Sequence, residues 1–132
     1  MTAIIRSTVV DVDLDAIAAN VRAVLSRSGV DVIAVVKADG YGHGAEAVAE
    51  AAIEAGAAAL AVATVEEAIV LRRTRPQDPL LVLLGASEQA ERDAAVQHDL
   101  SVTVWDVDSA RAMAEAARAA GNTVAPRWRE PP

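Results

Sequence analysis

The sequence alternates between short apolar runs and longer alanine-rich segments, and this alternation limits the possible folds more than any other feature. The apolar runs are rich in valine and leucine and contain almost no polar positions. Such runs are typical of strands covered on both faces, as in parallel sheets. They occupy residues 32–36, 58–62, 80–84 and 100–104.

The segments between these runs have apolar side chains three and four residues apart, which is the period of a helix. Gly29 follows the first segment as a stop signal, and Gly56 follows the second. Thr64 with Glu67 three residues later predicts a capping box at the start of the third. We therefore expect helices at residues 13–27, 44–55, 64–73, 87–97 and 106–120.

A helix followed by four strand–helix units predicts an α/β fold with parallel strands, because parallel strands need helical crossovers. Two architectures fit: a doubly wound sheet, or part of a (β/α) barrel. Residues 7–12 are extended in pattern and predict a separate strand of unknown partner. We expect one domain over residues 1–122. Residues 123–132 contain three prolines and predict an irregular tail.

Composition excludes several classes of function. The chain has no cysteine, which excludes disulfides, cysteine-ligated metals and a thiol nucleophile. A net charge of −7 and a pI near 4.7 argue against nucleic acid or an anionic membrane as partner. No targeting or membrane-spanning segment is visible, so a cytoplasmic protein is expected. Two distant histidines, His43 and His98, do not predict a metal site.

The most informative stretch follows the first apolar run. Lys37 comes directly after it, and the carboxyl end of a parallel strand is where ligands bind in both candidate architectures. A partly desolvated lysine there can act as nucleophile or base. The alternative is a solvated lysine at a strand end. Tyr41, the only tyrosine, lies among Gly40, Gly42 and Gly44, which allow tight turns and close approach of a ligand.

The same glycines permit a competing interpretation. Gly40-x-Gly42-x-x-Ala45 matches the Gly-x-Gly-x-x-Gly/Ala pattern of dinucleotide-binding proteins, after a strand and before a helix. The acidic residue that such proteins have about 20 positions further on, at the end of the next strand, is missing. This interpretation ranks below the one based on Lys37.

Residues 36–44, Val-Lys-Ala-Asp-Gly-Tyr-Gly-His-Gly, resemble the pyridoxal-phosphate attachment motif of alanine racemases. Supporting segments resemble the same family in order and spacing, so that the resemblance covers residues 10–121. These segments are residues 12–20, 54–57, 60–68, 81–86 and 100–104. The resemblance implies a (β/α)8 TIM-type barrel, of which about four β/α units are present.

The resemblance also implies roles for individual residues. Lys37 would form the Schiff base with pyridoxal 5'-phosphate and act as the base on one face of the substrate carbon. Tyr41 would bind the cofactor phosphate, and Leu84 would pack near the cofactor ring. His43 would be mainly structural. No residue is expected to bind a metal. The complete enzyme would interconvert L-alanine and D-alanine for peptidoglycan synthesis, as a homodimer.

The sequence departs from the family where its fifth strand should begin, near Thr123. In the family, a tyrosine from a second domain of the partner subunit serves the opposite face of the substrate, whereas Tyr41 is the sole tyrosine here. We therefore expect the first half of an alanine racemase barrel, truncated or frameshifted, and inactive or nearly inactive alone. A non-catalytic pyridoxal-phosphate-binding remnant is the alternative. A dinucleotide-binding α/β module ranks last.

Overall fold

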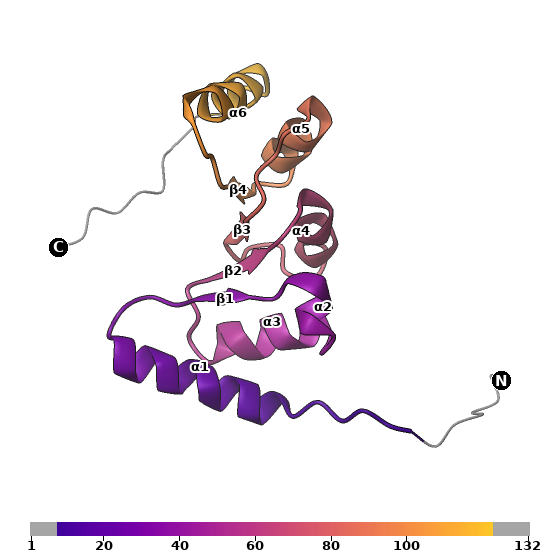
Figure 1. Ribbon diagram of the computed structural model, residues 1–132, viewed down its shortest axis with the longest axis vertical. Coiled ribbons are helices and arrows are strands. Elements are labelled where there is room, and N and C mark those ends of the chain that lie inside the picture. Colours follow the sequence, from indigo (N-terminus) through magenta and orange to yellow (C-terminus); the bar gives the residue numbers. More distant parts are fainter. Residues whose placement is uncertain (1–7, 123–132) are drawn as a thin grey trace.

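The chain forms a four-stranded parallel sheet with helices, as seen in the computed structural model, which describes residues 8–122 (Figure 1). The helices are longer than the strands, which span only two to four residues each. The elements in order are α1 (Leu14–Ser28), β1 (Ile33–Val35), α2 (Lys37–Tyr41), α3 (Ala45–Glu54), β2 (Ala59–Val62), α4 (Val65–Arg72), β3 (Leu80–Val82), α5 (Gln89–Gln97), β4 (Ser101–Val102) and α6 (Val107–Ala119).

The strand order decides between the two predicted architectures. The sheet runs β1-β2-β3-β4, so every crossover leads to the adjacent strand (Figure 1). A doubly wound sheet reverses direction at a switch point, whereas a (β/α) barrel adds its strands in sequence order. The prediction of a partial barrel is therefore confirmed. The order also removes the switch-point crevice on which a dinucleotide-binding module depends.

The core lies on the face of the sheet that packs against the helices. Its largest fully buried side chains are Leu60, Leu80, Val36, Val62 and Val82. They alternate along the strands with residues of the other face, as the period of two requires. Alanines fill the space between sheet and helices, because a small side chain lets a helix approach closely; they include Ala49, Ala52, Ala68 and Ala95.

The opposite face of the sheet corresponds to the inside of a barrel and is partly open. Ile33 and Val35 of β1 are 49% and 39% exposed. Within residues 8–122, β1 and β4 also each have one edge without a neighbouring strand. The structure thus has the open edges and uncovered interior expected of half a barrel.

Several predicted boundaries were wrong. Residues 8–12 form neither strand nor helix, because no neighbouring strand offers them hydrogen bonds; Ser7 and the predicted tail at 123–132 lie outside the described residues. The third and fourth strands end earlier than predicted, at Val82 and Val102, although apolar residues continue beyond them. Apolar pattern marks where side chains are buried, whereas the paired backbone is shorter.

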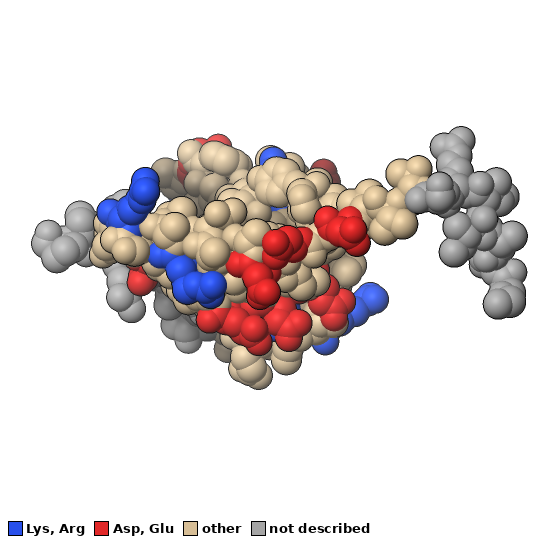
Figure 2. All heavy atoms as spheres, turned by 90° about the horizontal axis from the view of Figure 1, so that it is seen from below, with Lys and Arg blue, Asp and Glu red and all other residues tan. Residues whose placement is uncertain are grey.

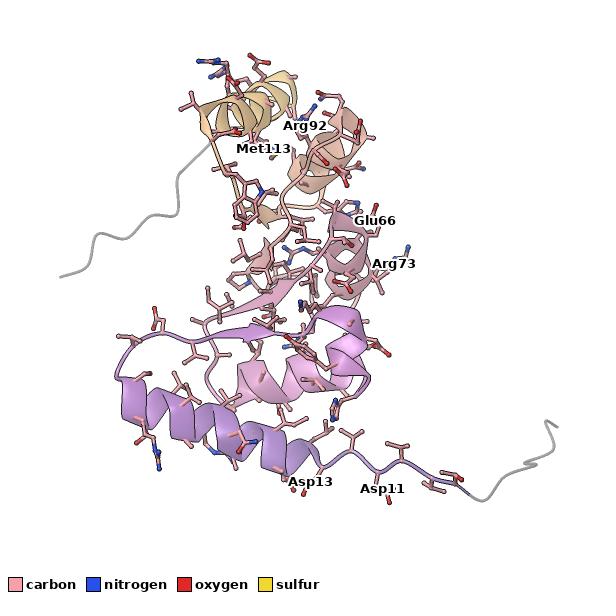
Figure 3. All side chains as sticks on the ribbon, viewed as in Figure 1. Asp11, Asp13, Glu66, Arg73, Arg92 and Met113 are labelled. Atoms are coloured by element: carbon pink, nitrogen blue, oxygen red, sulfur yellow. The ribbon has the colours of Figure 1, made fainter. Side chains whose placement is uncertain are left out.

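The helix ends follow the predicted signals closely. Gly29 adopts a left-handed conformation (φ 67°) and its N–H donates to the Leu25 carbonyl, which ends α1. Asp13 begins the same helix by accepting a hydrogen bond from the Ala16 N–H at 2.9 Å. At the far end of the sheet, α5 and α6 pack together, and Arg92 and Met113 lie where these helices face each other (Figure 3).

The cap of α6 gives a pH-dependent prediction. Asp106 accepts the Ser109 N–H at 2.7 Å, and this hydrogen bond lowers the pKa of its carboxyl below the ordinary 3.8. The folded chain therefore binds fewer protons at this site than the unfolded chain. The cap's contribution is present above the ordinary pKa and is lost as pH falls through the lowered one. The melting temperature of wild type should exceed that of Asp106→Ala by its largest amount at neutral pH, and this difference should shrink below pH 3.8.

The surface on the side of α1 carries a cluster of acidic side chains. Figure 2 shows Asp and Glu side chains gathered in the middle of this face, with several Lys or Arg side chains toward one end. Such a face repels a polyanion rather than attracting one, while the absence of a nucleic-acid partner stays a prediction. None of the helices within residues 8–122 combines the length and the apolarity needed to cross a membrane.

Candidate functional site

Parallel pairing brings two of the predicted site residues to one edge of the sheet. Lys37 follows β1, and Leu84 follows β3, so both lie beyond the carboxyl ends of their strands. The Leu84 N–H donates to the Ala63 carbonyl, just past the end of β2, at 3.0 Å. The carboxyl ends of barrel strands are where ligands bind in this class of fold. The candidate site therefore lies at this edge.

The segment after Lys37 has an unusual backbone that the sequence did not predict. In α2, Ala38, Asp39, Gly40 and Tyr41 all have positive φ, of 51°, 53°, 63° and 57°. This is one turn of left-handed helix, although three of the four residues have a Cβ. Each such residue costs about 1–2 kcal/mol relative to the right-handed form. Strain of this kind needs support from its surroundings and often occurs at functional sites.

Part of this support comes from within the segment. The Gly40 N–H donates to the Val36 carbonyl at 2.9 Å and so joins the turn to the end of the strand. The Asp39 carboxylate accepts the N–H of Ala45, the first residue of α3, at 2.8 Å. The His43 ring approaches the Gly40 carbonyl through Nδ1 at 3.0 Å. This last contact supports the structural role expected for His43.

The remaining support comes from Glu67, which sequence reasoning placed only in a capping box. Thr64 does cap α4, since its hydroxyl accepts the Glu67 N–H at 3.3 Å. The second half of the box is absent, because the Glu67 carboxylate accepts the N–H groups of Ala38 and Ala63 instead, each at 2.8 Å. The sequence offered no signal for the bond to Ala38, which joins residues 29 positions apart.

The predicted site side chains are accessible. The Lys37 side chain is half-buried, and its amine has no hydrogen bond or ion pair to any residue within 8–122. The Tyr41 side chain is 59% exposed and Leu84 is 67% exposed. A primary amine, a phenol and an apolar side chain suit an aldehyde, a phosphate and an aromatic ring respectively, so this donor set fits pyridoxal phosphate.

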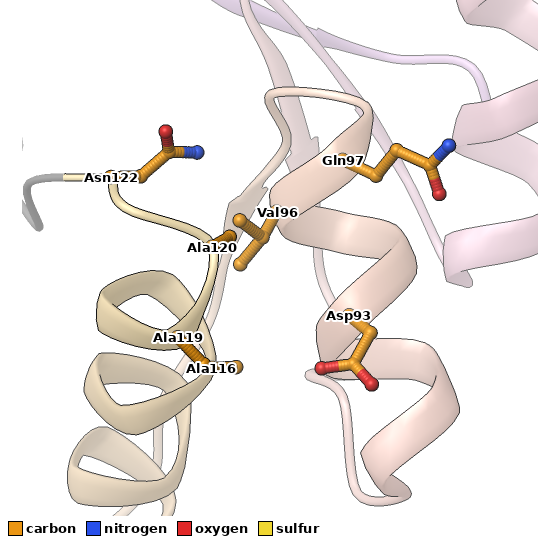
Figure 4. Close-up of a pocket in the computed structure, with 7 residues that line it drawn as sticks. All are labelled: Asp93, Val96, Gln97, Ala116, Ala119, Ala120 and Asn122. Carbon is orange, nitrogen blue, oxygen red and sulfur yellow. The ribbon is translucent and has the colours of Figure 1, made fainter.

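The candidate site is an open edge rather than an enclosed cavity. One pocket lies between α5 and α6 and is lined by Asp93, Val96, Gln97, Ala116, Ala119, Ala120 and Asn122 (Figure 4). A second lies on the helix side, against Val36, Val62 and α4. Neither is lined by Lys37, Tyr41 or Leu84.

The fold and the position of the candidate site define a β/α-barrel protein whose candidate site lies at the carboxyl ends of the strands. The sequence model described as the N-terminal domain of alanine racemase matches residues 12–126. The chain therefore belongs to the alanine racemase family.

Similar proteins agree with this assignment. The alanine racemase of Symbiobacterium thermophilum is 44% identical over 124 residues, which cover 93% of this chain and 31% of that protein. The alanine racemase of Geobacillus kaustophilus is 46% identical over 106 residues, or 78% of this chain and 27% of the relative. The chain thus spans less than a third of the length of these curated relatives.

Solved structures confirm the fold. The alanine racemase of Streptomyces coelicolor A3(2) superimposes with a TM-score of 0.75 at 41% identity, over 83% of this chain and 30% of that one. The enzyme of the D-cycloserine producer Streptomyces lavendulae gives a TM-score of 0.76 at 42% identity, over 85% and 29%. The predicted family and fold class are therefore confirmed, while the roles of Lys37, Tyr41 and Leu84 stay predictions.

Proposed function

We propose that this chain is the pyridoxal-phosphate-binding part of an alanine racemase, which in its complete form interconverts L-alanine and D-alanine. The observation that supports this most is the placement of Lys37. It is the only lysine in the 132 residues, and it lies at the carboxyl end of β1 with its amine unpaired among the described residues. Membership of the family makes pyridoxal phosphate the expected ligand of such an amine.

Each of the three predicted site residues then has a proposed role in binding the cofactor or in catalysis. Lys37 would hold the cofactor through its ε-amine, Tyr41 would donate its hydroxyl to the phosphate, and Leu84 would pack against the ring. When bound, pyridoxal phosphate supplies an electron sink that weakens the Cα–H bond of an amino acid. The Lys37 amine would remove a proton from the Cα of alanine, or return one to it, on one face of the substrate.

Racemisation also needs an acid–base group on the opposite face of the substrate. The resemblance to alanine racemases implies a tyrosine in this role, whereas Tyr41, the only tyrosine in this sequence, is assigned to the phosphate. The opposite group would therefore come from outside these 132 residues, and we expect the isolated chain to bind the cofactor without significant turnover. A homodimer in the complete form, cytoplasmic location and D-alanine supply for peptidoglycan stay predictions, as do the proposed domain limits of 1–122 and 123–132.

Borohydride trapping tests the proposal directly. The chain is mixed with pyridoxal phosphate, reduced, digested and mapped by mass spectrometry. Since Lys37 is the sole lysine, the only competing amine is the N-terminus. We expect the label on the peptide that contains Lys37, together with an absorbance band at the edge of the visible range before reduction. Lys37→Ala should lose both. A wild-type chain labelled only at its N-terminus would overturn the proposal.

A non-catalytic binder is the second candidate, because the sequence has no further tyrosine for the opposite face. Both candidates predict labelling of Lys37, so trapping alone does not separate them. Production of D-alanine from L-alanine separates them, when the chain is tested alone and after it is joined to the remaining part of a homologous racemase. Turnover by the joined protein supports the racemase. A lack of turnover despite labelled Lys37 supports the remnant.

A further inference from the structure

The contact that most constrains the candidate site is made by a residue outside the predicted site. The two carboxylate oxygens of Glu67 accept hydrogen bonds from two different strand ends. Oε1 accepts the Ala38 N–H, in the turn after β1, and Oε2 accepts the Ala63 N–H, just past β2, each at 2.8 Å. One side chain on α4 therefore joins the ends of two neighbouring strands.

The chemistry of this bridge requires a carboxylate. Two backbone N–H groups need two acceptors, and an ionised glutamate offers one on each oxygen. A glutamine of the same shape offers only one acceptor and places an NH2 group against the other N–H. Hydrogen bonds to an ionised acceptor are also stronger than those between neutral groups. Glutamate is thus the side chain of this length that satisfies both donors.

Hydrogen bonds hold the backbone on both sides of Lys37, and the Glu67 bridge supplies the second of them. On one side, the Val36 N–H donates to the Ala61 carbonyl of β2 at 2.8 Å. On the other side, the Ala38 N–H donates to Glu67. Ala38 is also the first residue of the left-handed turn, where the conformation is unfavourable for a residue with a Cβ. The bond to Glu67 therefore supports the strained turn at the point where it leaves Lys37.

The bridge also extends across the sheet to the other predicted residue. The carbonyl of Ala63, whose N–H donates to Glu67, accepts the Leu84 N–H at 3.0 Å. The path Ala38, Glu67, Ala63 and Leu84 is continuous in hydrogen bonds. Glu67 thus lies between the residues expected to hold the cofactor's aldehyde and its ring.

We propose that Glu67 is a positioning residue, which fixes the Lys37 backbone against the ends of β1 and β2 so that the amine is presented at the sheet edge. It touches neither the cofactor nor the substrate in this role. The consequence for cofactor binding rests on the function proposed above, whereas the consequence for the backbone does not.

Amide hydrogen exchange tests the backbone part without any cofactor. In Glu67→Ala, the N–H groups of Ala38 and Ala63 should exchange at least about tenfold faster, because each loses a charge-assisted bond. In Glu67→Gln, one of the two should keep part of its protection. Glu66→Ala is the matched control, since Glu66 is the exposed neighbour in the same first turn of α4 (Figure 3). Unchanged exchange at Ala38 in Glu67→Ala would refute the proposal.

Cofactor affinity tests the positioning part. The concentration of pyridoxal phosphate that half-saturates trapping of Lys37 should rise about tenfold in Glu67→Ala, which corresponds to one such bond, and less in Glu67→Gln. Thr64→Ala controls for a general loss of stability, because it removes the cap of the same helix but keeps the carboxylate. All variants are compared at a temperature where circular dichroism shows them folded.

The outcomes separate this inference from the proposed function. Faster exchange with weaker trapping in Glu67→Ala, but not in Thr64→Ala, supports the positioning role. Equal half-saturation in wild type and Glu67→Ala would overturn it, even with faster exchange. If the wild type is not trapped at all, the proposed function fails, and exchange at Ala38 and Ala63 alone decides whether Glu67 holds this backbone.

Discussion

Replacing Gly40 by alanine should destabilise the chain by about 2–4 kcal/mol, the combined effect of backbone strain and overpacking. Gly40 is buried with φ +63°, where a residue with a Cβ is disfavoured. An added Cβ would also lie 3.2 Å from both the N and the Cα of Ala45, and 3.3 Å from Val48 Cγ2. The first two contacts are with backbone, so α3 would have to move away from the Lys37 turn.

Gly42→Ala is the matched control for this effect. Gly42 also has a positive φ, of +83°, but an added Cβ would meet nothing within 4 Å. The strain remains without the contact, so the expected loss is only about 1–2 kcal/mol. Urea denaturation of both variants measures the difference. Equal losses would show that the close approach of Gly40 to Ala45 does not matter.

Much of the fold could be predicted from periodicity, because burial decides both the pattern and the structure. The four apolar runs became four strands, and Gly29 and Thr64 ended and began helices as expected. The strand order could not be predicted in this way. A buried strand has the same composition beside any neighbour, so periodicity left two architectures open, and the family resemblance alone favoured the barrel.

The candidate site was predicted less completely, for a physical reason. The position of Lys37 after an apolar run identifies the edge where it lies. The left-handed turn that follows contradicts the intrinsic preferences of Ala38 and Asp39. Its backbone groups are satisfied by hydrogen bonds within residues 36–45 and by one distant group, the carboxylate of Glu67. Local sequence patterns carry only local preference, so the Thr64–Glu67 spacing predicted a helix cap and gave no signal for the bond from Glu67 to Ala38.

Leu60→Ala should lower the stability by about 2–5 kcal/mol, because it leaves a cavity in a close-packed core. Leu60 lies in β2, the strand between β1 and β3, and is 0% exposed. Its neighbours in the sheet are Ala34 and Leu80, and neither can move far without breaking the pairing. The midpoint of urea denaturation should fall accordingly, with an unchanged slope.

Leu84→Ala is also a leucine-to-alanine change, but we expect it to affect cofactor binding rather than stability. Leu84 is 67% exposed, so its side chain buries little apolar surface in the folded chain. Its replacement by alanine should therefore alter the free energy of unfolding by no more than about 0.5 kcal/mol. If it packs against the cofactor ring, the pyridoxal phosphate needed for half-saturation should rise, by about tenfold for a contact of 1–2 kcal/mol. Leu60→Ala, compared while folded, should trap Lys37 at the wild-type concentration. A Leu84→Ala chain with unchanged half-saturation would remove Leu84 from the site and leave Lys37 and Tyr41 to hold the cofactor.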